Sequence, residues 1–384
     1  MKYKGPGLFI LMFLFLACQE DQLLFEKIDP GHSGIDFSNE LDPDSDLNIL
    51  NYLYYYNGGG VAAGDYNADG LTDLYFTSNE GADKLYLNKG DFRFEEVSSK
   101  SGIKNLGVWT TGISNVDING DGLLDIYISR VSGFQGLQGN NLLYVNKGKD
   151  QHGVPKFEEE SGKYGLDFSG FSTQSVFLDY DLDGDLDMFL LNHSVHPNRN
   201  YGRGNNRQGF DSQSGDRLFR NDGGFYKDVS NEAGIFQGKI GYGLGLSVGD
   251  LNGDSYPDIY VGNDFFENDY LYINTGNGSF TEMITSSPEK LGHTTHFSMG
   301  NDIADMNNDG RPDILSLDML PEDLQTYKTS GVEYPFQTYS NYLKNGYSPQ
   351  YMQNTLHINT GDLHFSETAF LSGIAASEWS WGAM

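Results

Sequence analysis

The sequence predicts an all-β protein, a β-propeller of four-stranded blades, and three observations support this prediction. First, a nine-residue acidic segment with Asp at positions 1, 5 and 9 and Asp or Asn at position 3 occurs five times in the 384 residues. Second, each copy is followed by a short apolar run, a Leu-aromatic-x-Asn run and a run that starts with Phe. Third, the 49 Gly, 25 Tyr and 25 Phe suit short strands joined by tight turns. Short antiparallel strands in regular repetition are typical of a propeller with one blade per repeat, and they favour it over a β-sandwich.

Each acidic segment, called an Asp loop below, carries the oxygen ligands of a Ca²⁺ site. Carboxylates at positions 1, 5 and 9, the Asp or Asn oxygen at position 3 and the backbone carbonyl at position 7 are the hard ligands that Ca²⁺ prefers. Gly at position 6 permits a sharp turn, but the fourth loop has Ser255 there and Tyr256-Pro257 next, so we expect that site to be the weakest. The sequence thus predicts about five structural Ca²⁺ sites, one per loop. Their ligands are Asp65, Asn67, Asp69, Leu71 and Asp73; Asp117, Asn119, Asp121, Leu123 and Asp125; Asp179, Asp181, Asp183, Asp185 and Asp187; Asp250, Asn252, Asp254, Tyr256 and Asp258; and Asp305, Asn307, Asp309, Arg311 and Asp313.

An EF-hand is a competing interpretation, since its loop also opens with Asp-x-Asn-x-Asp-Gly. An EF-hand needs a bidentate Glu at position 12. This chain has Phe76, Ile128, Leu190, Val261 and Ser316 there, and strands instead of helices on both sides. A plain Asp-rich turn is the other alternative, but carboxylates packed so closely would repel one another without a cation.

The repeat places the blades at about 52–103, 108–166, 172–235, 241–292 and 296–374. Residues 25–35 copy the fourth strand and its Gly-Ile ending, and we expect them to complete the last blade and close the ring. Residues 379–384 match the approach to a sixth Asp loop. We therefore expect residues 25–384 to be an incomplete propeller, with five complete repeats and the start of a sixth. The full ring is expected to have about six to eight blades, with seven favoured.

Residues 1–17 are predicted to be a lipoprotein signal peptide. Two lysines precede a nine-residue apolar stretch that is too short to span a bilayer as a helix. Cys18, the only cysteine, follows it and resembles the lipid-modified residue of a bacterial lipobox, with residues 18–24 as a short tether. This resemblance, together with that of Gln19-Glu20-Asp21 to the acidic tag of cell-surface lipoproteins, implies a secreted outer-membrane lipoprotein, exposed at the cell surface, that contacts the membrane only through its lipid anchor. The net charge of −30 argues against a nucleic-acid partner.

The repeat unit resembles the FG-GAP/VCBS repeat of integrin-α-type propellers, and the resemblance extends over the chain after Cys18. The segment Asn57–Ala62 before the first loop, and Gln19-Glu20-Asp21 after Cys18, resemble a surface lipoprotein subgroup of Bacteroidetes type. Members of that subgroup often carry a further ASPIC/UnbV region. The resemblance implies structural calcium on the lower face and partners bound at the upper face.

Two insertions are the candidate ligand-binding elements. They lie between the second and third strands of the third and fifth repeats, roughly at 193–215 and 319–353, on the face opposite the Asp loops. The first is basic and the second is rich in Tyr, which suits binding of a glycan or a partner protein. The candidate ligand residues are Arg199, Arg203, Arg207, Tyr334, Tyr339 and Tyr342. We expect a non-catalytic, surface-anchored binding module, with a role in nutrient capture or adhesion.

The alternative function is a polysaccharide lyase that acts on acidic glycans, with His193, His196 and Tyr201 as candidate catalytic groups. The pairs His193/His196 and His293/His296 also suggest zinc, but neither has a nearby third ligand, and residues i and i+3 of a strand point to opposite faces. A third alternative is a purely structural subunit of a larger surface complex.

Overall fold

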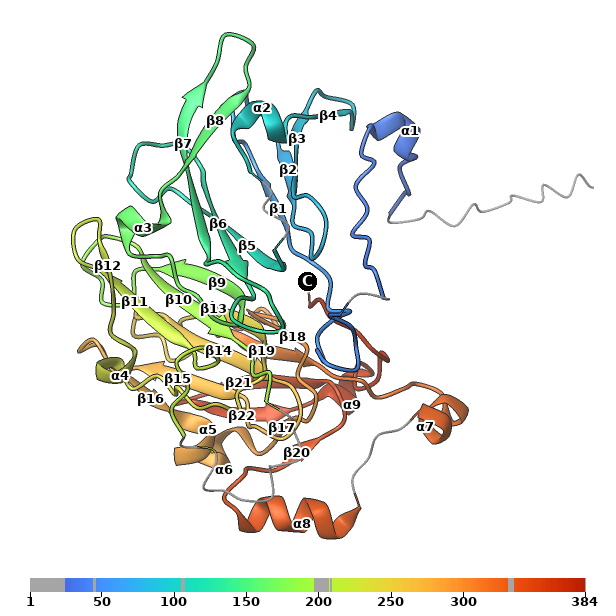
Figure 1. The fold of residues 1–384 in the computed structure, drawn as a ribbon. Helices are drawn as coiled ribbons and strands as arrows, with labels where there is room; N and C mark the ends of the chain where they lie inside the picture. The colour runs from blue at the N-terminus through green and yellow to red at the C-terminus, as the bar shows by residue number, and fades with distance from the viewer. Residues whose placement is uncertain are drawn as a thin grey trace, which may run out of the picture.

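A computed structural model describes residues 25–43, 46–104, 108–196, 207, 209–330 and 335–383 of the protein. It contains five four-stranded antiparallel sheets, called blades 1 to 5 below. In Figure 1 the blades follow one another in chain order along an open arc, from the blue blade 1 to the red blade 5. The predicted all-β fold with four-stranded repeats is therefore confirmed, whereas closure of the ring and the total number of blades stay predictions.

The four strands of each blade pair in the order in which they occur in the sequence. Blade 1 comprises β1 (Val61–Gly64), β2 (Asp73–Phe76), β3 (Lys84–Asn88) and β4 (Phe94–Glu96). Blade 2 comprises β5 (Thr110–Val116), β6 (Asp125–Arg130), β7 (Leu142–Lys149) and β8 (Pro155–Glu159). Blade 3 comprises β9 (Ser172–Leu178), β10 (Asp187–Asn192), β11 (Arg217–Asn221) and β12 (Tyr226–Asp228). Blade 4 comprises β13 (Gly243–Gly249), β14 (Asp258–Asn263), β15 (Tyr270–Asn274) and β16 (Phe280–Glu282). Blade 5 comprises β18 (Gly300–Ala304), β19 (Asp313–Leu317), β21 (Thr355–Gly361) and β22 (His364–Glu367).

The Asp loops join the first two strands of each blade, and the end of the blades that they form is called the loop face. The connections between the second and third strands lie at the opposite end, the insertion face, because consecutive turns of an antiparallel sheet alternate between its ends. On this face the insertion of blade 5 adds α7 (Leu324–Ser330), α8 (Phe336–Lys344) and β20 (Gln350–Tyr351), which pairs in parallel with β17 (Thr294–Thr295).

The innermost strands of neighbouring blades lie side by side, in the order β1, β5, β9, β13 and β18. Glycine permits this close approach: a Cβ built on Gly112 would lie 2.3 Å from the carbonyl O of Thr173 in the next blade. A Cβ on Gly300 would likewise lie 2.3 Å from the carbonyl O of Trp381. The predicted start of the next blade thus lies beside β18, where a further first strand would pack.

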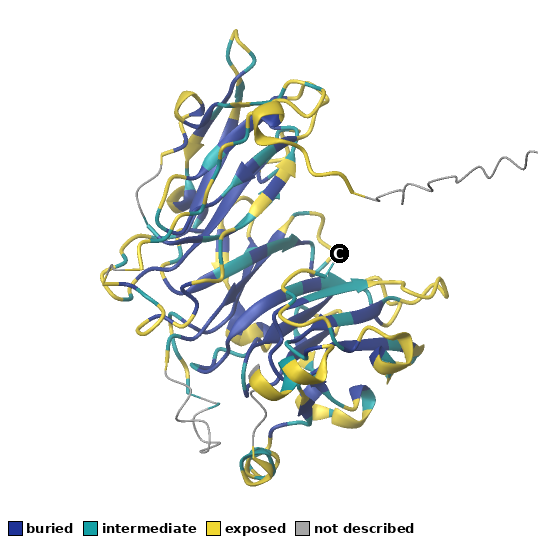
Figure 2. Cartoon of the chain, turned by 90° about the vertical axis from the view of Figure 1, so that its right-hand side faces the viewer, coloured by how far each residue is buried: buried dark blue, intermediate teal, exposed yellow. Residues whose placement is uncertain are grey.

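Apolar side chains fill the spaces between neighbouring blades. One cluster joins blades 1 and 2, a second joins blades 2 and 3, a third joins blades 3 and 4, and a fourth joins blades 4 and 5. The second strands β6, β10 and β14 are buried along their whole length because both faces of the sheet are covered. Figure 2 shows this arrangement, with buried strands and exposed turns at the rim.

Short helices connect each blade to the next. The connecting helices are α2 (Ser98–Ser101), α3 (Ser161–Tyr164), α4 (Ser230–Ala233), α5 (Met283–Ser286), α6 (Pro288–Leu291) and α9 (Ala369–Ser372). The Gly of the predicted Gly-Ile signature ends such a helix: Gly102 has a φ of 86° and donates its N–H to the carbonyl of Ser98. It also packs on the next blade, since a Cβ there would lie 2.7 Å from the carbonyl O of Phe157 in β8. Within the described residues, no helix has both the length and the apolar character needed to cross a bilayer.

The N-terminal segment differs from the prediction in one respect. Residues 25–29 form no strand, and Phe25 is exposed, because no other strand of the described residues lies beside them to supply hydrogen bonds. The Gly-Ile part of the prediction has a structural counterpart. The helix α1 (Pro30–Ser33) ends at Gly34, where a Cβ would lie 2.8 Å from the carbonyl O of Phe94 in β4. This segment therefore sits on blade 1 as α2 sits on blade 2.

Residues 47–56 cross the centre of the insertion face before blade 1 begins. Blade 1 starts at β1, so residues 52–60, predicted as part of this blade, precede its first strand. The Tyr52 hydroxyl lies 2.9 Å from His193 Nε2, at the end of blade 3. The Tyr54 hydroxyl donates to Asp264 Oδ2 of blade 4 at 3.3 Å. These tyrosines join an apolar cluster with side chains from blades 2, 3 and 4.

Candidate cation loops and ligand face

The carboxylate at position 1 organises the turn of every Asp loop. In the third loop, Asp179 Oδ1 accepts the N–H of Asp183 at 3.1 Å and Oδ2 accepts that of Gly184 at 3.0 Å. The same two bonds recur in all five loops, at Asp65, Asp117, Asp179, Asp250 and Asp305. The repeated sequence pattern therefore corresponds to one repeated backbone geometry.

The carboxylate at position 9 is fully buried in each loop and ties the loop to the third strand. Asp187 Oδ2 accepts the N–H of Tyr180 at 3.2 Å, and Oδ1 accepts the N–H of Asn221 in β11 at 2.8 Å. Burial raises the pKa of Asp187 to about 7, against the opposing effect of these two hydrogen bonds. The same cause raises the pKa of Asp258 to about 7, and those of Asp73 and Asp125 to about 6. A buried carboxylate whose pKa is raised in this way is stabilised when a proton or a cation binds to one of its lone pairs.

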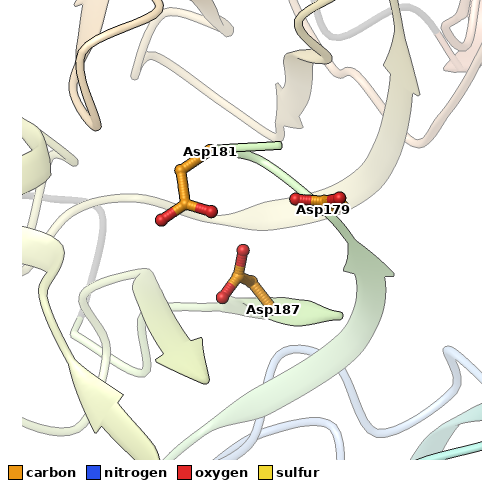
Figure 3. Close-up of side chains that lie close together, drawn as sticks. All are labelled: Asp179, Asp181 and Asp187. Atoms are coloured by element: carbon orange, nitrogen blue, oxygen red, sulfur yellow. The ribbon is translucent and has the colours of Figure 1, made fainter. Parts of the chain in front are cut away.

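The third loop brings three carboxylates together. Single oxygens of Asp179, Asp181 and Asp187 lie within 4.8 Å of one another, and Figure 3 shows the three side chains converging on one space. Asp181 Oδ1 is buried and has no hydrogen-bond partner, and Asn67 Oδ1, at position 3 of the first loop, is in the same state. An unpartnered buried oxygen is costly, and a cation would satisfy it. The described residues of these loops therefore fit a hard cation such as Ca²⁺.

Two backbone positions of each loop are left-handed. Position 6 has a positive φ in all five loops, and Ser255 adopts 76° although it is not Gly. Its N–H still donates to Asp250 Oδ2 at 2.8 Å, so the turn forms at the cost of backbone strain. Position 4 is also left-handed, which the sequence analysis missed: Ala68, Gly120, Leu182, Gly253 and Asn308 have φ between 52° and 76°. Gly at this position in two loops was the available signal.

The fifth loop contains its own positive charge. Arg311, at position 7, places Nη2 2.5 Å from Asp309 Oδ2, and its Nε donates to the carbonyl of Asn359 at 2.9 Å. The guanidinium thus neutralises a carboxylate that the prediction assigns to Ca²⁺. The sequence pattern predicts only the carbonyl of Arg311 as a ligand, and the competition from its guanidinium becomes visible only in the structure.

The Asn of the Leu-aromatic-x-Asn strand links neighbouring blades. Asn274 Nδ2 donates to the carbonyl of Tyr180, in the Asp loop of the preceding blade, at 2.7 Å. Asn146 reaches Tyr66 in the same way at 2.9 Å, and Asn359 reaches Leu251 at 2.8 Å. The motif therefore connects each of these blades to the loop before it.

A second series of Asp and Asn residues lies at the insertion face, two positions before the Leu of the same strand. Its members are Asp83, Asn141, Asp216, Asp269 and Asn354, all buried. In each, Oδ1 accepts a backbone N–H from the end of the second strand at 2.7 to 2.9 Å. Burial raises the pKa of Asp216 and Asp269 to about 7 and that of Asp83 to about 6. The constant spacing before the Leu was the sequence signal for this series.

Several predicted ligand residues hold the insertions in place. Arg207 forms an ion pair with the buried Glu267, with Nη2 2.7 Å from Oε1, and its guanidinium lies 4.5 Å from the centre of the Tyr347 ring. The Tyr342 ring stacks on Phe266 with ring centres 3.9 Å apart. Tyr339 is half-buried, 6.1 Å from the ring of Tyr351. Arg199, Tyr201, Arg203 and Tyr334 lie outside the described residues.

The histidines of the lyase and zinc alternatives have separate partners. His193 is buried beside Tyr52, and burial lowers its pKa to about 3. His196 Nε2 lies 2.9 Å from Asp211 Oδ2. His296 Nδ1 lies 3.0 Å from Gln350 Oε1. Among the described residues, the only group of at least three His, Cys, Asp or Glu side chains placed to hold a metal is the one in the third Asp loop.

Comparisons with known proteins agree with the repeat pattern. A family model described as FG-GAP-like repeat matches residues 65–128 and 250–316, which contain the first two and the last two Asp loops. Cartilage acidic protein 1 of Homo sapiens is 30% identical over 139 residues, which are 35% of this chain and 20% of that protein. The Mus musculus protein is also 30% identical, over 21% of its length. The chain thus matches about a fifth of the length of these relatives.

Two solved structures give low similarity scores. The biofilm matrix protein Bap1 of V. cholerae aligns with a TM-score of 0.32 and 18% identity, over 58% of this chain and 27% of that one. AofleA from Arthrobotrys oligospora aligns with a TM-score of 0.37 and 10% identity, over 80% of this chain and 72% of that one. Scores this low carry no argument, so the repeats are assigned from the family model. The chain contains FG-GAP-like repeats, as its Asp loops predict.

Proposed function

We propose that this chain is a non-catalytic, Ca²⁺-stabilised β-propeller that binds a glycan or a partner protein through its insertion face. We further propose that a lipid on Cys18 anchors it to the outer membrane, exposed at the cell surface, where it serves nutrient capture or adhesion. The observation that carries the calcium proposal is the unpartnered buried oxygen at position 3, on Asn67 and Asp181, inside loops of one repeated geometry. The position of both insertions opposite these loops supports binding at the other face.

Calcium in such loops acts on stability. Extracellular calcium modules bind with dissociation constants of about 10⁻⁴ to 10⁻³ M, so millimolar calcium adds about 1 kcal/mol per loop. Five loops together would add several kcal/mol to the free energy of unfolding. This would replace the stabilisation that intrachain disulfides provide, which these 384 residues cannot form with one cysteine.

Thermal unfolding in millimolar Ca²⁺, in Mg²⁺ and in EDTA tests the calcium proposal. We expect a higher melting temperature in Ca²⁺ than in Mg²⁺ or EDTA, and a smaller increase for Asp181→Ala. Identical melting curves in all three solutions would refute the proposal. Labelling with a radioactive fatty acid, abolished by Cys18→Ala, tests the anchor.

A glycan array, with and without Ca²⁺, tests the binding proposal. The lyase alternative predicts unsaturated products that absorb in the ultraviolet, and their appearance would contradict a non-catalytic function. The positions of His193 and His196 do not favour this alternative, because the two side chains contact different partners.

A further inference from the structure

The two insertions meet at one groove between blades 3 and 4, called the insertion groove below. It has a volume of about 730 Å³, within the range of small-molecule sites. Arg207 of the first insertion donates from Nη1 to the carbonyl of Gly346 in the second at 2.9 Å, although 139 residues separate them. The residues that line the groove and carry the argument are Arg207, Phe210, Phe236, Tyr270, Glu282 and Asn345.

Phe210 gives the groove an exposed aromatic wall. Its side chain is 68% exposed, but its backbone is fixed because Phe210 pairs with Gly238, and the Lys239 N–H donates to the carbonyl of Gly209 at 3.0 Å. Phe236 adds a second ring, 5.2 Å from that of Tyr270. Fixed aromatic rings offer apolar contact to a ligand at a low cost in conformational entropy.

Polar groups of the groove suit hydroxyl-rich ligands. Tyr270 lines the groove, but its hydroxyl is fully buried beside the Glu267 carboxylate and is not available to a ligand. The amide side chains of Asn231, Gln237 and Asn345 lie around the same space, and amides both donate and accept, as sugar hydroxyls require.

The charges of the groove disfavour an anionic ligand. Both Nε and Nη2 of Arg207 bind the carboxylate of Glu267, whose side chain is fully buried, so the pair is neutral. Glu282 also lines the groove, and its oxygens accept the N–H groups of Ile284 and Thr285. Among the described lining residues no cation is left to pair with a uronic acid or a sulfate.

We propose that the insertion groove binds a neutral oligosaccharide, with a sugar ring against Phe210 and sugar hydroxyls at the surrounding amide side chains. The proposal rests on the proposed binding function and narrows it to one site and one class of glycan. The basic sequence of the first insertion does not imply an acidic ligand here, since the described arginine there is already neutralised by Glu267.

Calorimetric titration in millimolar Ca²⁺ tests the proposal. The probes are hexasaccharides of glucose and of mannose, and hexagalacturonic acid as the acidic counterpart. We expect a neutral probe to bind at least about tenfold more tightly than the acidic one, and Phe210→Ala to weaken binding of the neutral probe at least about tenfold. Phe370→Ala is the matched control, because Phe370 is 67% exposed on α9 of blade 5 and is not among the residues that line the groove. It should leave binding unchanged, and thermal unfolding of each variant verifies its fold.

The outcomes separate this inference from the proposed function. Tighter binding of the acidic probe, or equal affinities of the Phe210→Ala and Phe370→Ala variants for a neutral probe, overturns the inference and leaves glycan binding intact. Groove-dependent binding of a peptide or protein in place of sugars overturns it and leaves a partner-binding function. A wild-type protein that binds neither sugars nor partners overturns both.

Discussion

Replacing Asp269 by Asn is expected to stabilise the protein at alkaline pH. Asp269 is fully buried in blade 4, where Oδ1 accepts the Asn263 N–H at 2.8 Å and Oδ2 accepts the Tyr260 hydroxyl at 2.7 Å. Blade 2 already has Asn at this place: Asn141 Nδ2 donates to the Tyr127 hydroxyl at 3.1 Å. The Thr295 hydroxyl also donates to Asp269 Oδ2, at 3.3 Å, as Asn141 Nδ2 donates to a second hydroxyl, that of Ser172. Because a hydroxyl either donates or accepts, Asn fits the site of Asp269 with the direction of both hydroxyl bonds reversed.

The size of the effect follows from the cost of burying a charge. Burial raises the pKa of Asp269 from 3.8 to about 7 in the folded protein. Between these values the folded state binds a proton that the unfolded state does not, so the free energy of unfolding decreases as the pH rises. At about 1.4 kcal/mol per pH unit, the cost reaches about 4 kcal/mol at pH 8 and about 1.5 kcal/mol at pH 5. The Asn variant has no such cost, so its advantage should shrink on acidification.

Urea unfolding at pH 8 and pH 5, at one Ca²⁺ concentration, measures this difference. The reverse variant Asn141→Asp is the matched control and should lose stability chiefly at pH 8. If Asp269→Asn destabilises the protein equally at both pH values, the hydrogen bonds of the carboxylate outweigh its desolvation, and the reasoning is wrong.

Three further predictions concern the loops. Ser255→Gly should raise the free energy of unfolding by about 0.5 to 1 kcal/mol, because Gly adopts the positive φ without strain; a loss of stability in urea unfolding would contradict this. Arg311→Ser should tighten Ca²⁺ binding at the fifth loop about two- to fivefold by freeing Asp309, and an unchanged terbium luminescence titration would contradict it. Asn274→Ala should lower the free energy of unfolding by about 2 to 4 kcal/mol, since buried carbonyls of two blades lose their donor. The Asn88 side chain donates only within blade 1, so Asn88→Ala should lower the free energy of unfolding by about 1 kcal/mol. Equal losses for the two variants in urea unfolding would show that the inter-blade bond adds nothing.

Much of the fold was predictable because it depends on local sequence. The Asp loops, the apolar strands after them and the Leu-aromatic-x-Asn strands each occupy a fixed place in the repeat, and pairing between consecutive strands follows from short turns. The closing strand expected at residues 25–35 was not predictable in the same way, because a strand also needs a neighbouring strand to pair with. Within the described residues, Gly34 packs against β4 of blade 1, whereas Phe25 is exposed.

The candidate ligand face was less predictable because its contacts join distant segments. Arg207 and its partner Glu267 are 60 residues apart, so the sequence shows a basic insertion where the structure contains a neutral pair. The stacking of Tyr342 on Phe266 is hidden for the same reason. The insertion-face Asp and Asn series could have been predicted from its constant spacing, two positions before the Leu of the third strand of each blade.

The segment that crosses the insertion face has a consequence for the order of folding. Each blade packs on the blades next to it in the sequence, so the blades can form one after another from the N-terminus onwards. Tyr52 and Tyr54 cannot follow this order, because their partners His193 and Asp264 lie 141 and 210 residues further along. The docking of these tyrosines therefore waits for blades 3 and 4, and it is among the last steps of assembly although they are among the first residues of the chain.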